Sequence, residues 1–284
     1  MDLHPHCLPC LAGLAHKGAR AATTDLDRQL KAIQKALAVL SDHNPKEPAP
    51  VAAAAIQSVI TETTGCEDPY ARVKAESTAM ALELLPGLKQ LTAQSPHPLE
   101  AAIRLSIAGN IIDFATLSHL DRGQLAHHMD TAFDQPIQGN LPNLIHRLKT
   151  AQTILWIADN AGEIVFDRLV LEQLDSTNLT LAVRGGAALN DATRSDARAA
   201  KIPKDITIMD TGLALPGTQL ESSTPEFQAA FAKADLIIAK GQGNFETLDH
   251  DDPRIVFLFQ VKCPVIEKNS GFPMGSRMAF TPGQ

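Results

Sequence analysis

The spacing of apolar residues divides the chain into two parts with different patterns. In the first hundred residues apolar side chains recur every three or four positions, which is typical of amphipathic helices. One such face carries Leu26, Leu30, Ile33, Leu37 and Leu40. Further helices are predicted at residues 51–63, 70–85 and 99–117, and Pro86-Gly87 is expected to end the second of these.

From residue 153 onward, short apolar runs alternate with helical patterns. The runs predict strands at 153–158, 179–184, 205–210, 235–240 and 255–261, with helices at about 162–174, 191–200, 224–233 and 243–249. Strands separated by helices indicate βαβ units, a parallel sheet and right-handed crossovers. We therefore expect an α/β domain over residues 101–284, after an all-helical N-terminal region over residues 1–100. The tail after Asn269 shows no clear element.

Composition excludes several classes of partner. The formal net charge of −7 argues against nucleic acid and anionic membranes, and one Trp and one Tyr offer little surface for stacking bases. No apolar stretch is long enough to span a bilayer. The segment Met1–Cys7 has neither the basic start nor the apolar core of a signal peptide. We expect a cytoplasmic protein with reduced cysteines.

Polar residues follow the predicted strands. Because parallel strands end at one edge of their sheet, these residues should meet there. They are Asp159-Asn160, Arg184-Gly185-Gly186 with Asn190-Asp191, Asp210-Thr211-Gly212, Lys240 to Glu246, and Lys262-Cys263. Carboxylate and amide oxygens suit a hard divalent cation, and lysine suits an anionic group. The edge is therefore a candidate site for a metal and an anionic ligand.

Ordinary structural roles compete with this interpretation. Asp, Asn and Gly after strands also serve as helix caps and turn residues, and Asp191 could be only an N-cap. Arg184 could bind an anionic substrate or pair with a nearby carboxylate, and Asp210 could join the acids or cap a turn. Capping requires neither Lys240 nor the pair Asp159-Asn160.

Four motifs in this order resemble the damage-control phosphatase family, long known only as a domain of unknown function. They are Gly109-Asn-Ile-Ile-Asp113, Asp159-Asn-Ala-Gly-Glu-Ile-Val-Phe-Asp167, Asn190-Asp-Ala-Thr193 and Lys240-Gly-Gln-Gly-Asn-Phe-Glu246. The resemblance covers nearly the whole chain. The chain resembles the small prokaryotic branch of that family also in Cys7-Leu-Pro-Cys10, Asp68-Pro-Tyr70 and Lys262-Cys263.

The resemblance implies a helical N-terminal region beside a Rossmann-like parallel sheet flanked by helices. It implies a phosphatase that needs Mn, Ni, Co or Mg and hydrolyses a small phosphorylated metabolite, such as a sugar phosphate or a damaged phosphometabolite. The implied metal ligands are Asp159, Asn160 and Asp191. The implied catalytic residues are Asp159, Glu163 and Lys240, and the candidate substrate contacts are Asn110, Asp113, Arg184, Lys240 and Asn244.

The expected mechanism is attack by water assisted by the metal. The cation would polarise the phosphoryl group and acidify a water molecule, while Lys240 would offset charge on the phosphate and Asp159 or Glu163 would receive a proton. Phosphatases with an aspartate nucleophile carry Asp-x-Asp after the first strand, whereas Ala161 stands at the second position here. This difference favours water over a phospho-enzyme.

The cysteines suggest a second metal at Cys7, Cys10 and Cys263, if the two ends of the chain meet. A single Cys-x-x-Cys is weak evidence because structural zinc takes four ligands. Plain burial or a turn at a helix start is the favoured explanation of the pair. The Gly241-x-Gly243 pair lacks the third glycine of a dinucleotide fingerprint, so NAD is not expected.

Two other functions remain open at this point. One family branch has been described as a protein-carboxyl methyltransferase, which would use S-adenosylmethionine; such enzymes normally carry a glycine-rich turn where this chain has Asp159-Asn160. The other is a non-catalytic metal- or ligand-binding module. The sequence leaves open the physiological substrate, the native metal and the oligomeric state.

Overall fold

Three N-terminal helices form a bundle with an apolar core of its own. The computed structural model of the chain describes residues 1–110, 132–133, 135–248 and 250–281. The bundle consists of α1 (Cys7–Ala22), α2 (Leu26–Ser41) and α3 (Ala49–Thr64). Their shared cluster contains Leu11, Ala15, Ala36, Ile56 and Ile60. The predicted α2 and α3 are confirmed, and Cys7–Cys10 forms the first turn of α1, a helix for which no range was predicted.

The next two helices pack beneath the sheet rather than in the bundle. These are α4 (Ala71–Gln94) and α5 (Pro98–Ala108), and both contribute to the cluster that contains the sheet residue Trp156. The expected end of α4 at Pro86 is wrong, because the helix continues through the proline. Burial of Leu85 and Leu88 against this core compensates for the hydrogen bond that Pro86 cannot donate. The packing favours a division of the chain between α3 and α4, earlier than residue 100.

The strands within the described residues form one mixed sheet in the order β1-β7-β6-β5-β2-β3-β4. All adjacent pairs are parallel except β6 and β7, which are antiparallel. The bounds are β1 (Ile137–Gly139), β2 (Ile154–Ile157), β3 (Leu179–Val183), β4 (Thr207–Asp210), β5 (Leu236–Lys240), β6 (Ile255–Gln260) and β7 (Arg277–Phe280). The five predicted strands are confirmed.

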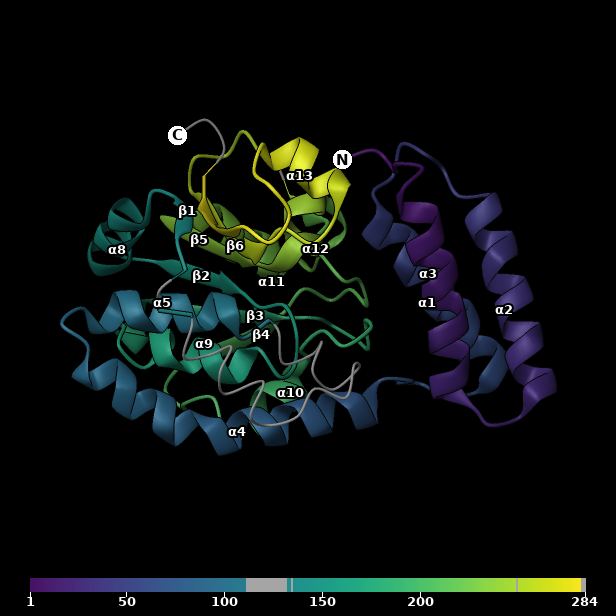
Figure 1. The fold of residues 1–284 in the computed structure, drawn as a ribbon, viewed down its shortest axis with the longest axis horizontal. Helices are drawn as coiled ribbons and strands as arrows, with labels where there is room; N and C mark the ends of the chain where they lie inside the picture. Colours follow the sequence, from purple (N-terminus) through teal and green to yellow (C-terminus); the bar gives the residue numbers. More distant parts are fainter. Residues whose placement is uncertain (111–131, 134, 249, 282–284) are drawn as a thin grey trace.

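Helices cover both faces of this sheet (Figure 1). They are α8 (Leu141–Thr150), α9 (Ile164–Leu171), α10 (Arg194–Ala199), α11 (Pro225–Lys233), α12 (Gly241–Thr247) and α13 (Pro264–Ser270), with short 3-10 turns at Ser176–Asn178 and Leu220–Ser222. Alternate residues of β2 serve opposite faces: Ile154 and Trp156 pack with α4, α5, α8 and α9, whereas Leu155 and Ile157 pack with the phenylalanines of α11 and α12. No described helix is both long and apolar enough to cross a bilayer.

The strand order places β2, the strand that leads to Asp159, in the interior of the sheet. Strand β2 pairs with β3 on one side and with β5 on the other, so the chain turns back at this point. In open α/β sheets ligands bind at the carboxyl ends of the strands at such a switch point. The bundle α1–α3 stands at this same edge, beside the loops that leave β2, β3 and β4 (Figure 1).

In the sheet domain, two α-helices and two strands were missed by the sequence patterns. Strand β1 and α8 precede the first predicted strand, and α13 and β7 follow the last one. The expectation of no element after Asn269 is therefore wrong. Strand β7 is only four residues long and is buried between β1 and β6, so it shows neither alternation nor a long apolar run.

Close backbone contact after β3 provides a test of this architecture. The Gly185 N–H donates to the carbonyl of Leu213 at 2.9 Å, and a Cβ atom on Gly185 would lie 2.4 Å from the Gly212 carbonyl carbon. Gly185→Ala should therefore lower the free energy of unfolding by about 2 kcal/mol in urea titrations.

Gly87→Ala is the matched control. Gly87 lies inside α4 with open space around the position of a Cβ atom. Alanine there should raise the free energy of unfolding by about 0.5–1 kcal/mol, because it lowers the conformational entropy of the unfolded chain and causes no clash in the folded one. Equal effects of the two substitutions would contradict the close packing at Gly185.

Candidate active site

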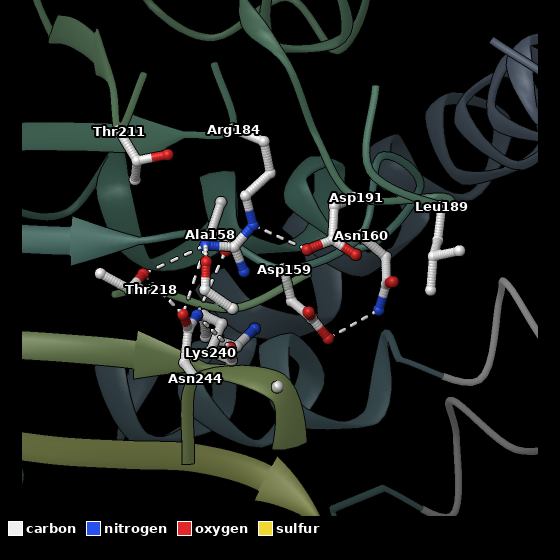
Figure 2. A network of polar contacts seen from close by, with 12 residues as sticks. Ala158, Asp159, Asn160, Arg184, Leu189, Asp191, Thr211, Thr218, Lys240 and Asn244 are labelled. Atoms are coloured by element: carbon white, nitrogen blue, oxygen red, sulfur yellow. Dashed lines mark hydrogen bonds and ion pairs between the residues drawn. The ribbon is translucent and has the colours of Figure 1, made fainter. Parts of the chain in front are cut away.

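Two loop segments are joined by backbone hydrogen bonds at the ends of β2 and β3. The Ala192 N–H donates to the Asp159 carbonyl at 2.7 Å, and the Ala161 N–H donates to the Asn190 carbonyl at 2.9 Å. Asn160 and Asp191 are therefore partners in an isolated antiparallel bridge. Figure 2 shows the side chains of Asp159, Asn160 and Asp191 turned toward a common space. The structure thus brings together all three residues predicted to hold the metal.

Asp191 does not act as a helix cap. The N-cap of α10 is Thr193, whose hydroxyl and N–H both bond to the Asp196 carboxylate. The carboxylate of Asp191 instead accepts from Arg184 Nε at 2.7 Å. The capping interpretation of Asp191 is therefore wrong.

Amide groups connect Asp159 to Glu163. Asn160 Nδ2 donates to Asp159 Oδ2 at 2.8 Å and to Glu163 Oε2 at 3.0 Å. Asn110 Nδ2 donates to the same two carboxylates, at 3.3 Å to Asp159 and at 2.6 Å to Glu163. Asn110 comes from the residues that follow α5, so the sub-sheet helices contribute directly to the site. Asp113, the other residue predicted on this wall, lies outside the described residues.

Lys240 is buried among oxygen atoms at the end of β5. Its Nζ lies 2.7 Å from Glu163 Oε1 and 2.5 Å from Asp167 Oδ1, and it donates to the hydroxyl of Ser106 at 2.9 Å. Burial alone would lower the pKa of Lys240, but Asp167 and Glu163 together raise it above its ordinary value. The ammonium is therefore held charged and its donors are engaged. Direct contact between Lys240 and a phosphate stays a prediction.

Asp167 and Ser106 belong to this site although sequence reasoning gave neither a role. The buried carboxylate of Asp167 accepts from Ser106 Oγ at 2.6 Å, from Trp156 Nε1 at 3.2 Å and from Lys240. Asp167 does close the motif that begins at Asp159. Its spacing of four from Glu163 places both carboxylates on one side of α9, which was the signal available in the sequence.

Arg184 performs one of the two roles considered for it. Besides Asp191, its guanidinium donates through Nη1 to the Gly217 carbonyl at 2.7 Å, to Thr218 Oγ1 at 3.2 Å and to Asn244 Oδ1 at 3.3 Å. Pairing with a carboxylate at the sheet edge is thus observed. Its Nη2 is buried and has no hydrogen-bond partner among the described residues, which leaves the N–H groups of this nitrogen for a ligand.

Asn244 is fully buried within the framework of the site. Its Nδ2 donates to the Lys240 carbonyl at 2.7 Å, and its Oδ1 accepts from Thr218 Oγ1 at 2.9 Å as well as from Arg184 (Figure 2). Asn244 therefore ties the start of α12 to Arg184. Its predicted contact with substrate stays a prediction.

Charge in the site is unbalanced. Four buried or half-buried carboxylates, those of Asp159, Glu163, Asp167 and Asp191, face two buried cations, Lys240 and Arg184. Burial raises the pKa of Asp159, and Asp191 and Glu163 raise it further, while Arg184 and Lys262 oppose the shift. Burial also raises the pKa of Asp191 to about 6 against the opposing effect of Arg184. The carboxylates lack two positive charges, the charge of one divalent cation.

Free oxygen atoms in the site match a cation of this kind. Within the described part of the chain, Asp159 Oδ1, Asn160 Oδ1 and Asp191 Oδ1 accept no hydrogen bond, whereas the second oxygen of each carboxylate does. The Oδ1 of Asn110 is buried and has no partner among the described residues either. Carboxylate and amide oxygens are ligands of hard cations. The donor set therefore fits Mn or Mg in the position predicted from the sequence.

The remaining strand ends serve the fold. Asp210 accepts from the Gly212 N–H at 3.0 Å and pairs with Arg194, so it caps a turn rather than joining the acids. A Cβ atom on Gly243 would lie 2.1 Å from the Pro216 carbonyl oxygen. This glycine is therefore required by a close approach of two backbone segments. Lys262 is exposed, and its charge lies near enough to Asp159 to oppose the rise in the pKa of that carboxylate.

The described residues lend no support to the predicted second metal site at the cysteines. Cys10 is exposed and Cys7 and Cys263 are half-buried; all are free thiols. Burial raises the pKa of the Cys7 thiol. Glu246, Cys263 and Cys10 lie near enough to raise this pKa further. No group of three or more His, Cys, Asp or Glu in the described residues could hold a metal. A metal at these cysteines gains no support and stays a prediction.

Comparison with known proteins agrees with the geometry. Residues 3–278 match the family described as Damage-control phosphatase ARMT1-like domain. The chain belongs to this family. A damage-control phosphatase of Pyrococcus horikoshii is 31% identical over 286 residues, which cover 97% of this chain and 96% of the relative. One of Archaeoglobus fulgidus is 30% identical over 285 residues, covering 98% and 99%.

A solved structure supports the fold as well. The crystal structure of a DUF89 family protein from Pyrococcus horikoshii superposes with a TM-score of 0.91 at 30% identity, and the match covers 99% of both chains. The expected α/β architecture with a helical N-terminal region is thus confirmed for this damage-control phosphatase family member.

Removal of the buried ammonium tests the ion cluster. Lys240→Met should lower the free energy of unfolding by about 3–5 kcal/mol near pH 7, because Glu163 and Asp167 would lose their shared cation. Lys46→Met is the control, since Lys46 and Asp2 form an exposed pair that solvent screens, so its loss should change stability little. Chemical denaturation of both variants measures the difference, and similar losses would contradict the buried cluster.

Glu246 offers a test of pH dependence away from the ion cluster. Burial raises the pKa of Glu246 to about 7, against the opposing charge of the N-terminal ammonium. The folded state then binds the proton more tightly than the unfolded state. Stability should therefore fall as pH rises from about 4.5 to 7, by on the order of 2 kcal/mol. Glu246→Gln should reduce this fall, and an unchanged slope in denaturation midpoints would contradict the assignment.

Proposed function

We propose that this protein is a metal-dependent phosphatase that hydrolyses phosphate monoesters of small metabolites, such as sugar phosphates or damaged phosphometabolites. The observation that carries the proposal is the meeting of free oxygens from Asp159, Asn160 and Asp191 in a site short of two positive charges. Family membership and relatives named damage-control phosphatases support the same activity.

Asp159, Asn160 and Asp191 would hold the divalent cation, through the oxygens that accept no hydrogen bond. When bound, such a cation supplies Lewis-acid activation of the phosphoryl group and of water. Arg184 and Asn160 orient the two carboxylates by bonding their other oxygens, at 2.7 Å to Asp191 and 2.8 Å to Asp159. Such outer contacts fix the direction in which ligand atoms point. Mn, Ni, Co and Mg all suit this proposal.

Arg184 would also contact the phosphate. Its buried Nη2 has no partner within the part of the chain that the structure describes, and a buried donor without a partner is costly unless a ligand uses it. The guanidinium is held rigidly by Asp191, Gly217 and Asn244, so no side-chain ordering is needed when the phosphate arrives. Charge that develops on the phosphoryl oxygens would thus meet a preorganised donor.

Lys240 and Asp167 would set the position of Glu163. Both oxygens of Glu163 are engaged, Oε1 with Lys240 and Oε2 with Asn110 and Asn160. Of the two carboxylates predicted to accept a proton from the attacking water, Asp159 is therefore the better candidate. Glu163 in turn holds the two amides whose N–H groups bond Asp159.

Substitution of the two aspartates tests the proposal. Asp159→Asn and Asp191→Asn should each lower Mn²⁺-dependent hydrolysis of p-nitrophenyl phosphate by at least about 100-fold, because each removes charge from the cation site. Asp210→Asn is the control, since it changes another strand-end aspartate that caps a turn. It should keep its activity, and circular dichroism should show that all three variants are folded.

Retained hydrolysis in Asp159→Asn would remove that residue from the reaction. Inactivity of the unchanged protein with Mn, Ni, Co and Mg over a panel of phosphorylated metabolites would contradict phosphatase function. In that case, calorimetric titration with S-adenosylmethionine would test the methyltransferase alternative, which no described residue favours.

A further inference from the structure

The loop that carries Asp191 is held from outside the sheet domain by the N-terminal bundle. This loop joins the end of β3 to α10 and passes through Ala187, Ala188 and Leu189 before it reaches Asp191. The side chain of Leu189 packs against the apolar cluster of α1–α3. In Figure 2 Leu189 lies beside Asn160 and Asp191, so this contact is next to the site.

Gln57 of α3 binds the backbone of the loop at two points. Its Nε2 donates to the Ala187 carbonyl at 2.9 Å, and its Oε1 accepts from the Leu189 N–H at 2.6 Å. The side chain is buried. A single amide thus satisfies a donor and an acceptor two residues apart, which fixes the direction of both peptide groups.

The backbone held by Gln57 has an unfavourable conformation. Leu189 has φ of +51°, in the left-handed region that residues other than glycine and asparagine rarely adopt. Such a conformation persists only where surrounding contacts enforce it. The bond from the Leu189 N–H to Gln57 and the packing of its side chain on the bundle are the contacts that do so here.

This conformation determines where Asp191 points. The Asp191 N–H donates to the Ala188 carbonyl at 2.9 Å, which closes a turn around Leu189. The following residue, Ala192, donates to the Asp159 carbonyl. If Leu189 adopted a negative φ, the turn from Ala188 to Asp191 would open. We expect the Asp191 carboxylate then to move away from Asp159.

We propose that Gln57 is a positioning residue for the catalytic centre, through which the helical bundle fixes the Asp191 carboxylate beside Asp159 and Asn160. This inference rests on the proposed function, because it assigns Asp191 to the metal. Gln57 itself touches neither the metal ligands nor, in the proposed mechanism, the substrate.

The experiment compares Gln57→Met with Gln228→Met. The first keeps the length of the side chain and removes both bonds to the loop. The second is matched, because Gln228 Nε2 also donates to two backbone carbonyls, Ser223 at 2.9 Å and Glu221 at 3.3 Å, in a loop before α11. Calorimetric titration with Mn²⁺ measures affinity, and hydrogen exchange of the metal-free protein measures protection of the amides of residues 187–192.

Gln57→Met should raise the Kd for Mn²⁺ by about tenfold or more and speed exchange at the Leu189 and Asp191 amides. Gln228→Met should change neither. Gln57→Glu keeps the acceptor for the Leu189 N–H, so the Leu189 amide of this variant should stay protected from exchange. If Gln57→Met does not fold, Gln57→Glu takes its place in the hydrogen-exchange measurement.

Unchanged Kd in a folded Gln57→Met would overturn the inference, whether or not exchange becomes faster. If the unchanged protein does not bind Mn²⁺, the proposed function fails instead. Faster exchange in Gln57→Met would then still support control of the loop by Gln57, so the two failures are distinguishable.

Discussion

The buried ion cluster of Lys240, Glu163 and Asp167 is the interaction on which the site depends. It joins the end of β5 to α9, and through Ser106 it reaches α5. An ammonium enclosed this way is stable only with carboxylates beside it, and each carboxylate is stable only with the ammonium. The cluster therefore fixes Glu163, and Glu163 fixes the amides that bond Asp159. The groups at the sheet edge are thus held in place by three buried charges, those of Lys240, Glu163 and Asp167.

Around this cluster, each element supplies one part of the site. The sheet places Asp159 and Lys240 beyond or at the ends of adjacent strands at the switch point, and the bridge between Asn160 and Asp191 brings the other two proposed ligands beside Asp159. Arg184 and Asn244 bind the loops after β3, β4 and β5 to one another. The bundle then holds the Asp191 loop through Gln57. These contacts fix the oxygen atoms of the proposed ligands in a site that lacks two positive charges.

Local patterns in the sequence predicted what depends on local residues. The apolar runs located β2 to β6, and polar residues after them located Asp159, Asn160 and Asp191. The continuation of α4 through Pro86 could not be predicted, because burial of neighbours against α9 overrides the propensity of proline. Lys240 shows the same limit: its type suggested a phosphate contact, whereas its partners Asp167 and Ser106 become neighbours only in the folded chain. The two bonds of Gln57 span more than 100 positions and leave no periodic signal.

The place of β7 has a consequence for the order in which the sheet is completed. Among the described strands, β1 pairs only with β7, and β7 lies between β1 and β6 although it comes last along the chain. During synthesis on the ribosome, residues 137–139 have left the exit tunnel long before residues 277–280 emerge. The edge formed by β1 and β7 can therefore form only after the C-terminal segment has been synthesised. Strands β2, β3 and β5, which lead to the site, can pair earlier. Contacts so distant in sequence slow folding. Among the strand pairings, this late one lies at the edge of the sheet farthest from Asp191.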